Sequence, residues 1–218
     1  MLCSLLKSAN SFADVGCDHG YCSEYVLKNG LCKDVVFSDV SKGSLAKAEK
    51  LLAAYVECGQ ARAVLGDGFF GVSKDTEEVL IAGMGGSEII SILSHETYGF
   101  MPRYFVFQPM HDSEKLRRYI LENDGYIERD FTFFDGKFYD VIVGGKAAGR
   151  TQKAYSDAEY EFGRENLETM SKDFTDKIKK LLKNTDKYLQ IEGLGENSRE
   201  ELEARKQRLD GVLKGEIK

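Results

Sequence analysis

The stretch FADVGCDHGY, from Phe12 to Tyr21, decides which fold the sequence predicts. It begins as a short, mostly apolar run that ends near Asp14, which is the pattern of a strand buried in a sheet. It then passes through Gly16 into a loop that carries Asp18. A buried strand that opens into a glycine-containing loop is typical of the first unit of a doubly wound α/β sheet, where such a loop faces a ligand. The stretch contains no lysine or arginine beside its acids.

The composition is that of an ordinary globular chain of 218 residues, 42% hydrophobic and 30% charged. No apolar run approaches the roughly 20 residues of a membrane span, and the N-terminus is too short and polar for a signal peptide, so we expect a cytoplasmic protein. The five cysteines are expected to be reduced thiols, and without a CxxC pair no metal site is expected. The net charge of −6 argues against a broad nucleic-acid-binding surface but leaves room for a local basic patch. The sequence does not indicate an oligomeric state.

Residues 12–146 alternate between strand and helix patterns. Gly30 is placed to end the first helix, Ser41 to begin the second, and Gly59 to end it. Two strand patterns in 126–145 are joined at Asp-Gly-Lys, which predicts a hairpin. We therefore expect an α/β fold with a doubly wound parallel sheet and one antiparallel strand at or near an edge. The parallel strands are expected within 12–16, 34–40, 61–68, 77–86 and 103–110.

The last third of the chain has a helical pattern only, so the prediction is a domain over 1–150 and a helical hairpin over 155–218. Capping boxes are predicted at Ser156 with Glu159 and at Ser198 with Glu201. The hairpin either caps its own domain or serves as an arm for a large substrate. One predicted helix face carries Leu167, Met170, Phe174, Ile178 and Leu181, and nearly opposite it lie Lys172, Lys179 and Lys183.

Polar residues and glycines follow every predicted parallel strand. Because the carboxyl ends of parallel strands meet at one edge of a sheet, we expect these residues to form one site. They are Asp14, Gly16, Asp18 and His19 after the first strand, Asp39 after the second, Asp67 and Gly68 after the third, Gly83, Met84, Gly85 and Gly86 after the fourth, and Gln108 and Pro109 after the fifth.

The chemistry of this edge favours a nucleoside that carries positive charge and no phosphate. Asp39 lies 23 residues after Gly16, near the spacing at which an acid binds ribose hydroxyls. Asp67 is placed to accept a hydrogen bond from an adenine amino group. The first loop lacks the full GxGxxG fingerprint, and Asp18 would repel a pyrophosphate. S-adenosylmethionine, with its adenine, ribose, sulfonium and ammonium groups, is such a ligand.

Four motifs, DVGCDHGY, GDGF, IAGMGG and QPM, resemble in order and spacing those of the bacterial tRNA (adenine(22)-N1)-methyltransferase family, often called TrmK-like. The family's versions are D-I-G-[ST]-D-H-A-Y, G-D-G-L, I-A-G-M-G-G and Q-P-N. The resemblance implies a class I methyltransferase (Rossmann-like) fold, S-adenosylmethionine as methyl donor, and transfer to N1 of an adenine in tRNA. It covers roughly residues 12–146, and the helical tail is also like the family's.

From the residues and the resemblance together we assign two groups of site residues. Asp18 is a candidate to stabilise the positive charge of methylated N1, Gln108 to hold the adenine N6 amino group, and Tyr21 to stack on the base, which must be turned out into a pocket. Donor binding is assigned to Asp14, Gly16, Cys17, Asp18, His19, Asp39, Val40, Asp67, Gly68, Gly83, Met84 and Gly85.

The chain also departs from the family pattern. Met110 stands where the family has asparagine, Cys22 and Ser23 replace Leu-Pro, and Asp39 replaces the more usual glutamate. The family has an additional N-terminal helix with an arginine, whereas this chain reaches its first strand by Phe12, so we expect a truncated or divergent member. The alternatives are a methyltransferase for another RNA or a small molecule, and a non-catalytic protein that binds the donor.

Overall fold

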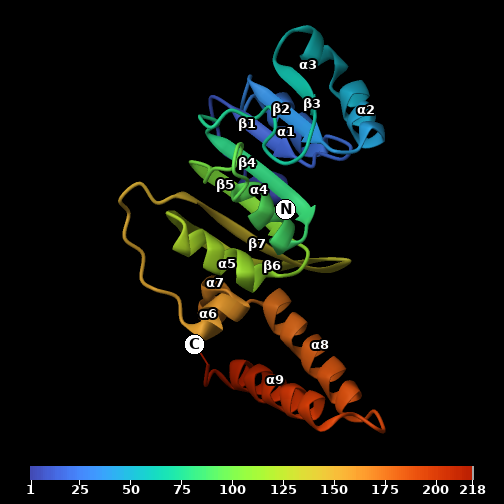
Figure 1. The fold of residues 1–218 in the computed structure, drawn as a ribbon, viewed down its shortest axis with the longest axis vertical. Coiled ribbons are helices and arrows are strands. Elements are labelled where there is room, and N and C mark those ends of the chain that lie inside the picture. Colours follow the sequence, from blue (N-terminus) through green and yellow to red (C-terminus); the bar gives the residue numbers. More distant parts are fainter. Residues whose placement is uncertain (218) are drawn as a thin grey trace. The chain divides into compact units, whose positions relative to one another are not determined.

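The computed structural model describes residues 1–217, and a seven-stranded sheet in the order β3-β2-β1-β4-β5-β7-β6 organises them (Figure 1). β1 to β5 pair in parallel, and β7 runs antiparallel to β5, one position in from the edge strand β6. This confirms the predicted doubly wound sheet with a closing hairpin. The strands are β1 (Phe12–Val15), β2 (Val35–Asp39), β3 (Ala61–Leu65), β4 (Glu78–Met84), β5 (Tyr104–Pro109), β6 (Gly125–Asp135) and β7 (Lys137–Lys146).

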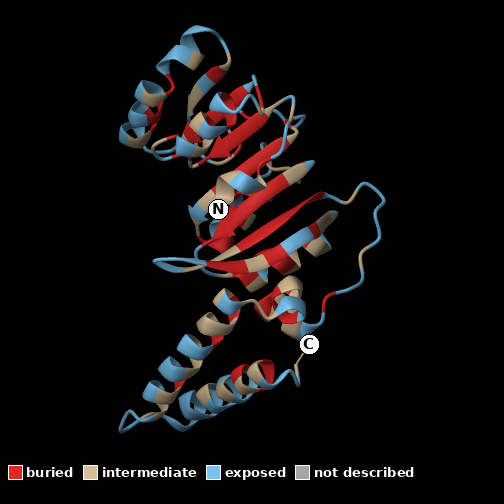
Figure 2. Cartoon of the chain, turned by 180° about the vertical axis from the view of Figure 1, so that it is seen from behind, coloured by how far each residue is buried: buried red, intermediate tan, exposed pale blue. Residues whose placement is uncertain are grey.

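The central strands are buried on both faces, which explains why they read as continuous apolar runs in the sequence (Figure 2). All four residues of β1 are buried. The chain builds β1, β2 and β3 toward one edge and then returns to place β4 on the other side of β1. The strand order therefore reverses between β1 and β4, and the crevice outside their carboxyl ends is where a sheet of this kind binds its ligand.

The helices between the strands follow the prediction with one difference. Ser41 caps the second helix as expected, because its Oγ accepts a hydrogen bond from the Ser44 N–H at 3.3 Å. That helix does not continue to Gly59: it breaks at Leu52, whose side chain is fully buried in the core. The elements are the 3₁₀ helix η1 (Leu2–Leu5) and the helices α1 (Tyr21–Lys28), α2 (Lys42–Leu51), α3 (Ala53–Glu57), α4 (Gly86–Leu93) and α5 (Ser113–Glu122).

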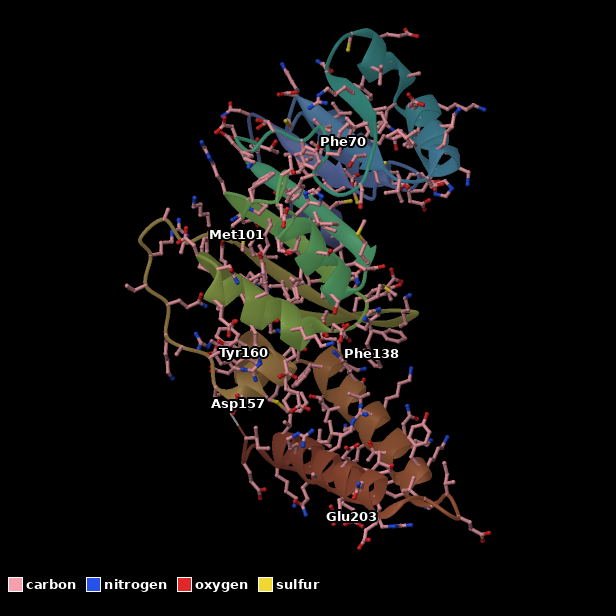
Figure 3. All side chains as sticks on the ribbon, in the orientation of Figure 1. Phe70, Met101, Phe138, Asp157, Tyr160 and Glu203 are labelled. Atoms are coloured by element: carbon pink, nitrogen blue, oxygen red, sulfur yellow. The ribbon has the colours of Figure 1, made fainter. Side chains whose placement is uncertain are left out.

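The chain forms two compact units, one of residues 1–129 with 141–153 and the other of residues 130–140 with those from Ala154 onward. The outer half of the β6–β7 hairpin thus belongs with the helical tail. Buried Asn166 explains this, because its Oδ1 accepts from the Thr132 N–H at 2.8 Å and its Nδ2 donates to the Thr132 Oγ1 at 3.0 Å. Lys177 adds an ion pair with Asp140 at 2.6 Å. Figure 3 labels Phe138, near the tip of this hairpin.

The tail contains four helices in the described residues, α6 (Asp157–Phe162), α7 (Arg164–Thr169), α8 (Lys172–Leu189) and α9 (Glu196–Lys214). The predicted capping box at Ser156 is confirmed. The one at Ser198 is wrong, because α9 begins earlier and Gly195 is its N-cap. The predicted apolar face is split by Met170, whose φ of +46° ends α7. All five apolar residues still meet in one core cluster with Leu209 and Val212 of α9.

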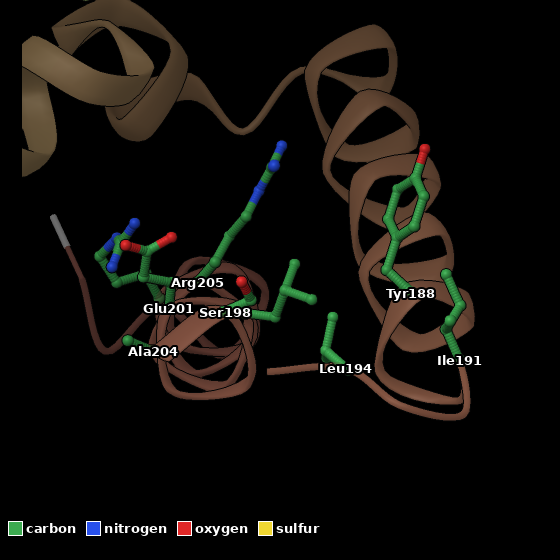
Figure 4. A pocket seen from close by; sticks show the side chains of 9 residues that line it. Tyr188, Ile191, Leu194, Ser198, Glu201, Ala204 and Arg205 are labelled. Atoms are coloured by element: carbon green, nitrogen blue, oxygen red, sulfur yellow. The ribbon is translucent and has the colours of Figure 1, made fainter. Parts of the chain in front are cut away.

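The end of α8, the turn that follows it and the first half of α9 line an open pocket of about 650 Å³ (Figure 4). Tyr188 lines it from the end of α8, Ile191 from the turn, and Ser198 and Arg205 from α9. Within the described part of the chain, no helix combines the length and the apolar composition that a membrane crossing requires.

Candidate active site

Asp39, at the carboxyl end of β2, holds the first loop in place. Its Oδ2 accepts a hydrogen bond from the Asp18 N–H at 3.0 Å, and its Oδ1 accepts one from the Ser41 N–H at 2.7 Å. The loop itself turns at Gly16, with φ +73°, and at Asp18, with φ +48°. One carboxylate therefore joins the loops after β1 and β2, as the sequence-based grouping of these strand ends requires. The two oxygens keep further lone pairs for a ligand.

Asp14 lies beneath this loop as a buried carboxyl group. Its Oδ2 accepts a hydrogen bond from the Ser23 hydroxyl at 2.8 Å. Burial raises the pKa of Asp14 to about 6, the charge on Asp39 adds to the rise, and the Ser23 hydrogen bonds oppose it. Cys17 is also buried, and burial raises the pKa of its thiol, so the group stays protonated at neutral pH. Of these residues, Ser23 was not predicted, since a serine inside a helix gives no signal of its own.

His19 connects Asp18 to a lysine that is distant in sequence. Its Nδ1 lies 2.6 Å from the Asp18 Oδ2, and its Nε2 lies 3.4 Å from the Lys47 Nζ. Because an ammonium can only donate, the Lys47 contact favours the neutral tautomer in which Nδ1 carries the proton. The hydrogen bond with His19 lowers the pKa of Asp18. The loop after β1 contains no lysine or arginine of its own, and Lys47 of α2 brings a positive charge beside it.

Tyr21 presents its ring to solvent at the start of α1. Its side chain is 65% exposed, and the ring lies parallel to that of His19 at 5.7 Å between centroids. A parallel, exposed pair of rings is a surface on which a base can stack. This is the arrangement that the predicted role of Tyr21 requires, although the role itself stays a prediction.

The end of β4 approaches the loop after β1 through Met84. Gly16 has a φ of +73°, which favours glycine, and a Cβ there would also have to displace the flexible end of the Met84 side chain, Cε. Gly83 has a φ of +78° and no atoms where a Cβ would point. Gly85 is the N-cap of α4, and its N–H donates to the Glu88 Oε2 at 2.7 Å. This N–H therefore already has a partner within the protein.

Gln108 is buried, and its side-chain amide forms hydrogen bonds with other residues of the protein. Its Oε1 accepts from the Gly83 N–H at 3.1 Å, and its Nε2 donates to the Pro109 carbonyl at 3.1 Å and lies 3.5 Å from the Met110 sulfur. The side chain therefore joins the irregular end of β4 to the end of β5. Its predicted contact with an adenine amino group stays a prediction.

The end of β3 completes the edge. The Gly66 N–H donates to the Asp39 carbonyl at 3.2 Å, which brings the Asp67–Gly68 turn beside β2. Asp67 is exposed, and Val40 is 69% exposed, so an acid and an apolar surface lie open at this end. Phe70, labelled in Figure 3, is also largely exposed. In the described residues no cluster of three or more histidine, cysteine or acidic side chains could hold a metal ion.

A Rossmann-like sheet that carries acidic and glycine-rich loops at its switch point, without a phosphate-binding loop, defines the class of protein: a methyltransferase of the Rossmann-like type. The structure of the B. subtilis M1A22 tRNA methyltransferase TrmK shares this fold, with a TM-score of 0.80 at 21% identity over 97% of this chain and 95% of that one. M. capricolum TrmK aligns with a TM-score of 0.84 at 21% identity over 100% of this chain and 96% of that one.

The chain belongs to the TrmK family, described as tRNA (adenine(22)-N(1))-methyltransferase, whose model matches residues 12–214. A protein of Mycoplasma pneumoniae assigned as a tRNA methyltransferase is 30% identical over 152 residues, which is 68% of this chain and 69% of that protein. The predicted family, fold class and class of enzyme, a methyltransferase that acts on tRNA, are confirmed.

Proposed function

We propose that this chain binds S-adenosylmethionine at the carboxyl edge of β1, β2 and β4 and transfers its methyl group to N1 of adenine 22 in tRNA. The family supports the reaction. The relatives support the donor, since a Streptococcus pneumoniae protein is described in complex with S-adenosyl-L-methionine and M. capricolum TrmK with S-adenosylhomocysteine. The observation that carries the proposal is the Asp39 carboxylate, which joins the loops after β1 and β2 and keeps lone pairs with which it can accept from a ligand.

The residues present fit a cationic nucleoside. Asp14 in β1, Asp18 in the loop that follows it and Asp39 at the end of β2 provide three carboxyl groups, which would attract a sulfonium and an ammonium and repel a phosphate. Asp39 is proposed to bind the ribose hydroxyls, and exposed Asp67 and Val40 are proposed to offer an acceptor and an apolar surface to adenine. The bound donor supplies a methyl group already activated by the sulfonium, so the protein's task is to align the acceptor and exclude water.

The acceptor base is proposed to lie against Tyr21, stacked on the outer side of the parallel ring pair. N1 gains positive charge as it is methylated, and the ionised Asp18 carboxylate is the group proposed to stabilise that charge. Gln108 acts as a positioning residue, because it accepts a hydrogen bond from Gly83 and so holds the end of β4.

The division of labour between the parts of the chain is also a proposal. Residues 1–150 carry the donor and the chemistry, and residues 155–218 contribute to holding tRNA. Because the substrate is tRNA, we place the protein in the cytoplasm. The alternative acceptors, another RNA or a small molecule, are outcomes of the experiment below.

The test is methyl transfer from labelled S-adenosylmethionine to an unmodified tRNA transcript with adenine 22, followed by nucleoside analysis. The matched control is the same transcript with guanine at that position. We expect 1-methyladenosine in the first transcript only. Equal labelling of both transcripts would move the acceptor elsewhere in the RNA, and donor binding without labelling of any RNA would contradict the proposed reaction.

A further inference from the structure

Two thiols outside the proposed site lie in contact with each other. The Cys3 sulfur, in η1, is 3.8 Å from the Cys22 sulfur, in the first turn of α1, and both residues are partly exposed. Since a disulfide has an S–S length of about 2 Å, the two sulfurs need to approach by less than about 2 Å to bond. Cys32 and Cys58 differ, because their thiols donate to the backbone carbonyls of Asp34 and Tyr55.

The two ends of this contact are not equally fixed. η1 has no buried residue and is held by the Leu5 carbonyl, which accepts from the Tyr104 hydroxyl at 3.2 Å, whereas α1 buries Ser23, Val26 and Leu27 in the core. A bond between the sulfurs would therefore draw η1 onto α1 and leave the helix where it is. Ser23, the neighbour of Cys22, keeps its hydrogen bond to buried Asp14 in that case.

We propose that Cys3 and Cys22 are a redox-active pair that closes into a reversible disulfide, which ties η1 to α1 and stabilises the fold under oxidising conditions. Thiol pairs of this kind in intracellular proteins respond to the disulfides of the glutathione pool. The proposal concerns a modification of the protein and stands independently of the donor and the acceptor.

The chemistry is thiol–disulfide exchange with glutathione disulfide as oxidant. The Cys3 thiolate attacks one sulfur of glutathione disulfide, forms a mixed disulfide and releases one glutathione thiolate. Cys22 then loses its proton, and its sulfur attacks the Cys3 sulfur and releases the second glutathione. Two protein thiols are oxidised to one disulfide, one glutathione disulfide is reduced to two thiols, and the two protons end on glutathione. Burial raises the pKa of Cys22, which places it in the second, intramolecular step.

The test uses the full chain with Cys58→Ser, which removes the exposed thiol. The protein is equilibrated with reduced and oxidised glutathione, quenched with acid and analysed by mass. We expect the loss of two hydrogens and a link between tryptic peptides 1–7 and 8–28, both reversed by dithiothreitol. Because peptide 8–28 also contains Cys17, the same experiment on Cys22→Ser in this background identifies the partner: it should give no link and a glutathione adduct on Cys3.

Thermal unfolding separates the stabilising bond from an incidental one. We expect the oxidised protein to unfold roughly 5–10 °C higher than the reduced one, since the bond closes a loop of nearly twenty residues. Glutathione adducts without the internal link, a link that survives Cys22→Ser, or an unchanged midpoint would each overturn the proposal. Calorimetry with S-adenosylmethionine is the further readout, which rests on the proposed function. A loss of donor affinity beyond about threefold on oxidation, in protein that binds when reduced, would overturn the inference that α1 stays in place.

Discussion

Replacing Asp39 with alanine tests the proposed donor site most directly. The change removes the acceptor of two hydrogen bonds, from the Asp18 N–H at 3.0 Å and from the Ser41 N–H at 2.7 Å. Both N–H groups lie where water can replace the lost partner, so the fold should persist. What the variant loses is the carboxylate proposed to hold the ribose and the bond that keeps the Asp18 loop in its left-handed turn.

The magnitude follows from the type of hydrogen bond. A bond to a charged acceptor contributes about 1.5–3 kcal/mol, and partial exposure places this one toward the lower end. In the variant, donor binding must also order the Asp18 loop, which adds a free-energy cost. In the wild-type protein the Asp39 hydrogen bond already orders this loop. Together these predict a loss of about 1.4–2.8 kcal/mol in donor binding, which is a ten- to hundredfold weaker affinity.

The assay is titration calorimetry with S-adenosylmethionine, with circular dichroism to show that the variant is folded. Asp34→Ala is the matched control, because Asp34 is an exposed acid just before β2, at the strand's other end. We expect the control to bind as the wild type does. A folded Asp39→Ala protein with donor affinity within twofold of wild type would refute the reasoning and remove Asp39 from the site, as would an equal loss in the control.

Three further changes test other parts of the molecule. Asp18→Asn should lower turnover more than donor affinity, because the carboxylate is proposed to act on the methylated base; equal losses in kcat and in donor affinity would leave it only a donor-binding role. Changing Lys172, Lys179 and Lys183 to glutamine should weaken tRNA binding and flatten the slope of log affinity against log salt by up to about 2–3 units, with donor affinity unchanged. An unaltered slope would mean that these exposed lysines, of which Lys172 pairs with Asp176 at 2.7 Å, contact no phosphate. Glu78 is buried with one carboxylate oxygen unpartnered, and burial raises its pKa to about 7 from 4.5. The protonated Glu78 therefore contributes its full stability below pH 4.5, and this contribution is lost as the pH rises through about 7. Glu78→Gln should then raise the free energy of unfolding over wild type by up to about 3 kcal/mol at pH 8 and by little at pH 4. Urea titrations that show the same difference at both pH values would contradict this.

The fold could be predicted from the sequence because its signals are local. The apolar run before Asp14 and the spacing from Gly16 to Asp39 depend only on neighbouring residues and on the periods of strand and helix. Parallel strands then bring their carboxyl ends together whatever the details of packing. The meeting of the Asp18 loop and Asp39 at one edge follows from that rule, whereas the hydrogen bond between them is a finding of the structure.

The contacts that complete the site depended on tertiary structure. Lys47 reaches His19 from a helix 28 residues away, and Met84 covers Gly16 from another strand. No periodicity encodes such pairs, because they depend on how elements pack and on which rotamers the packing allows. The same limit applies to Gly85, since only the structure shows that Glu88 occupies its N–H.

The tail shows the division between the two sources most clearly. The sequence by itself determined which residues are apolar and therefore that Leu167, Phe174 and Ile178 would be buried together. It did not determine the break at Met170, where one positive φ turns a single predicted helix into two. Hydrophobic burial follows composition and spacing, which are properties of the chain. The left-handed backbone at Met170 depends on how the neighbouring segments pack, which only the folded structure decides.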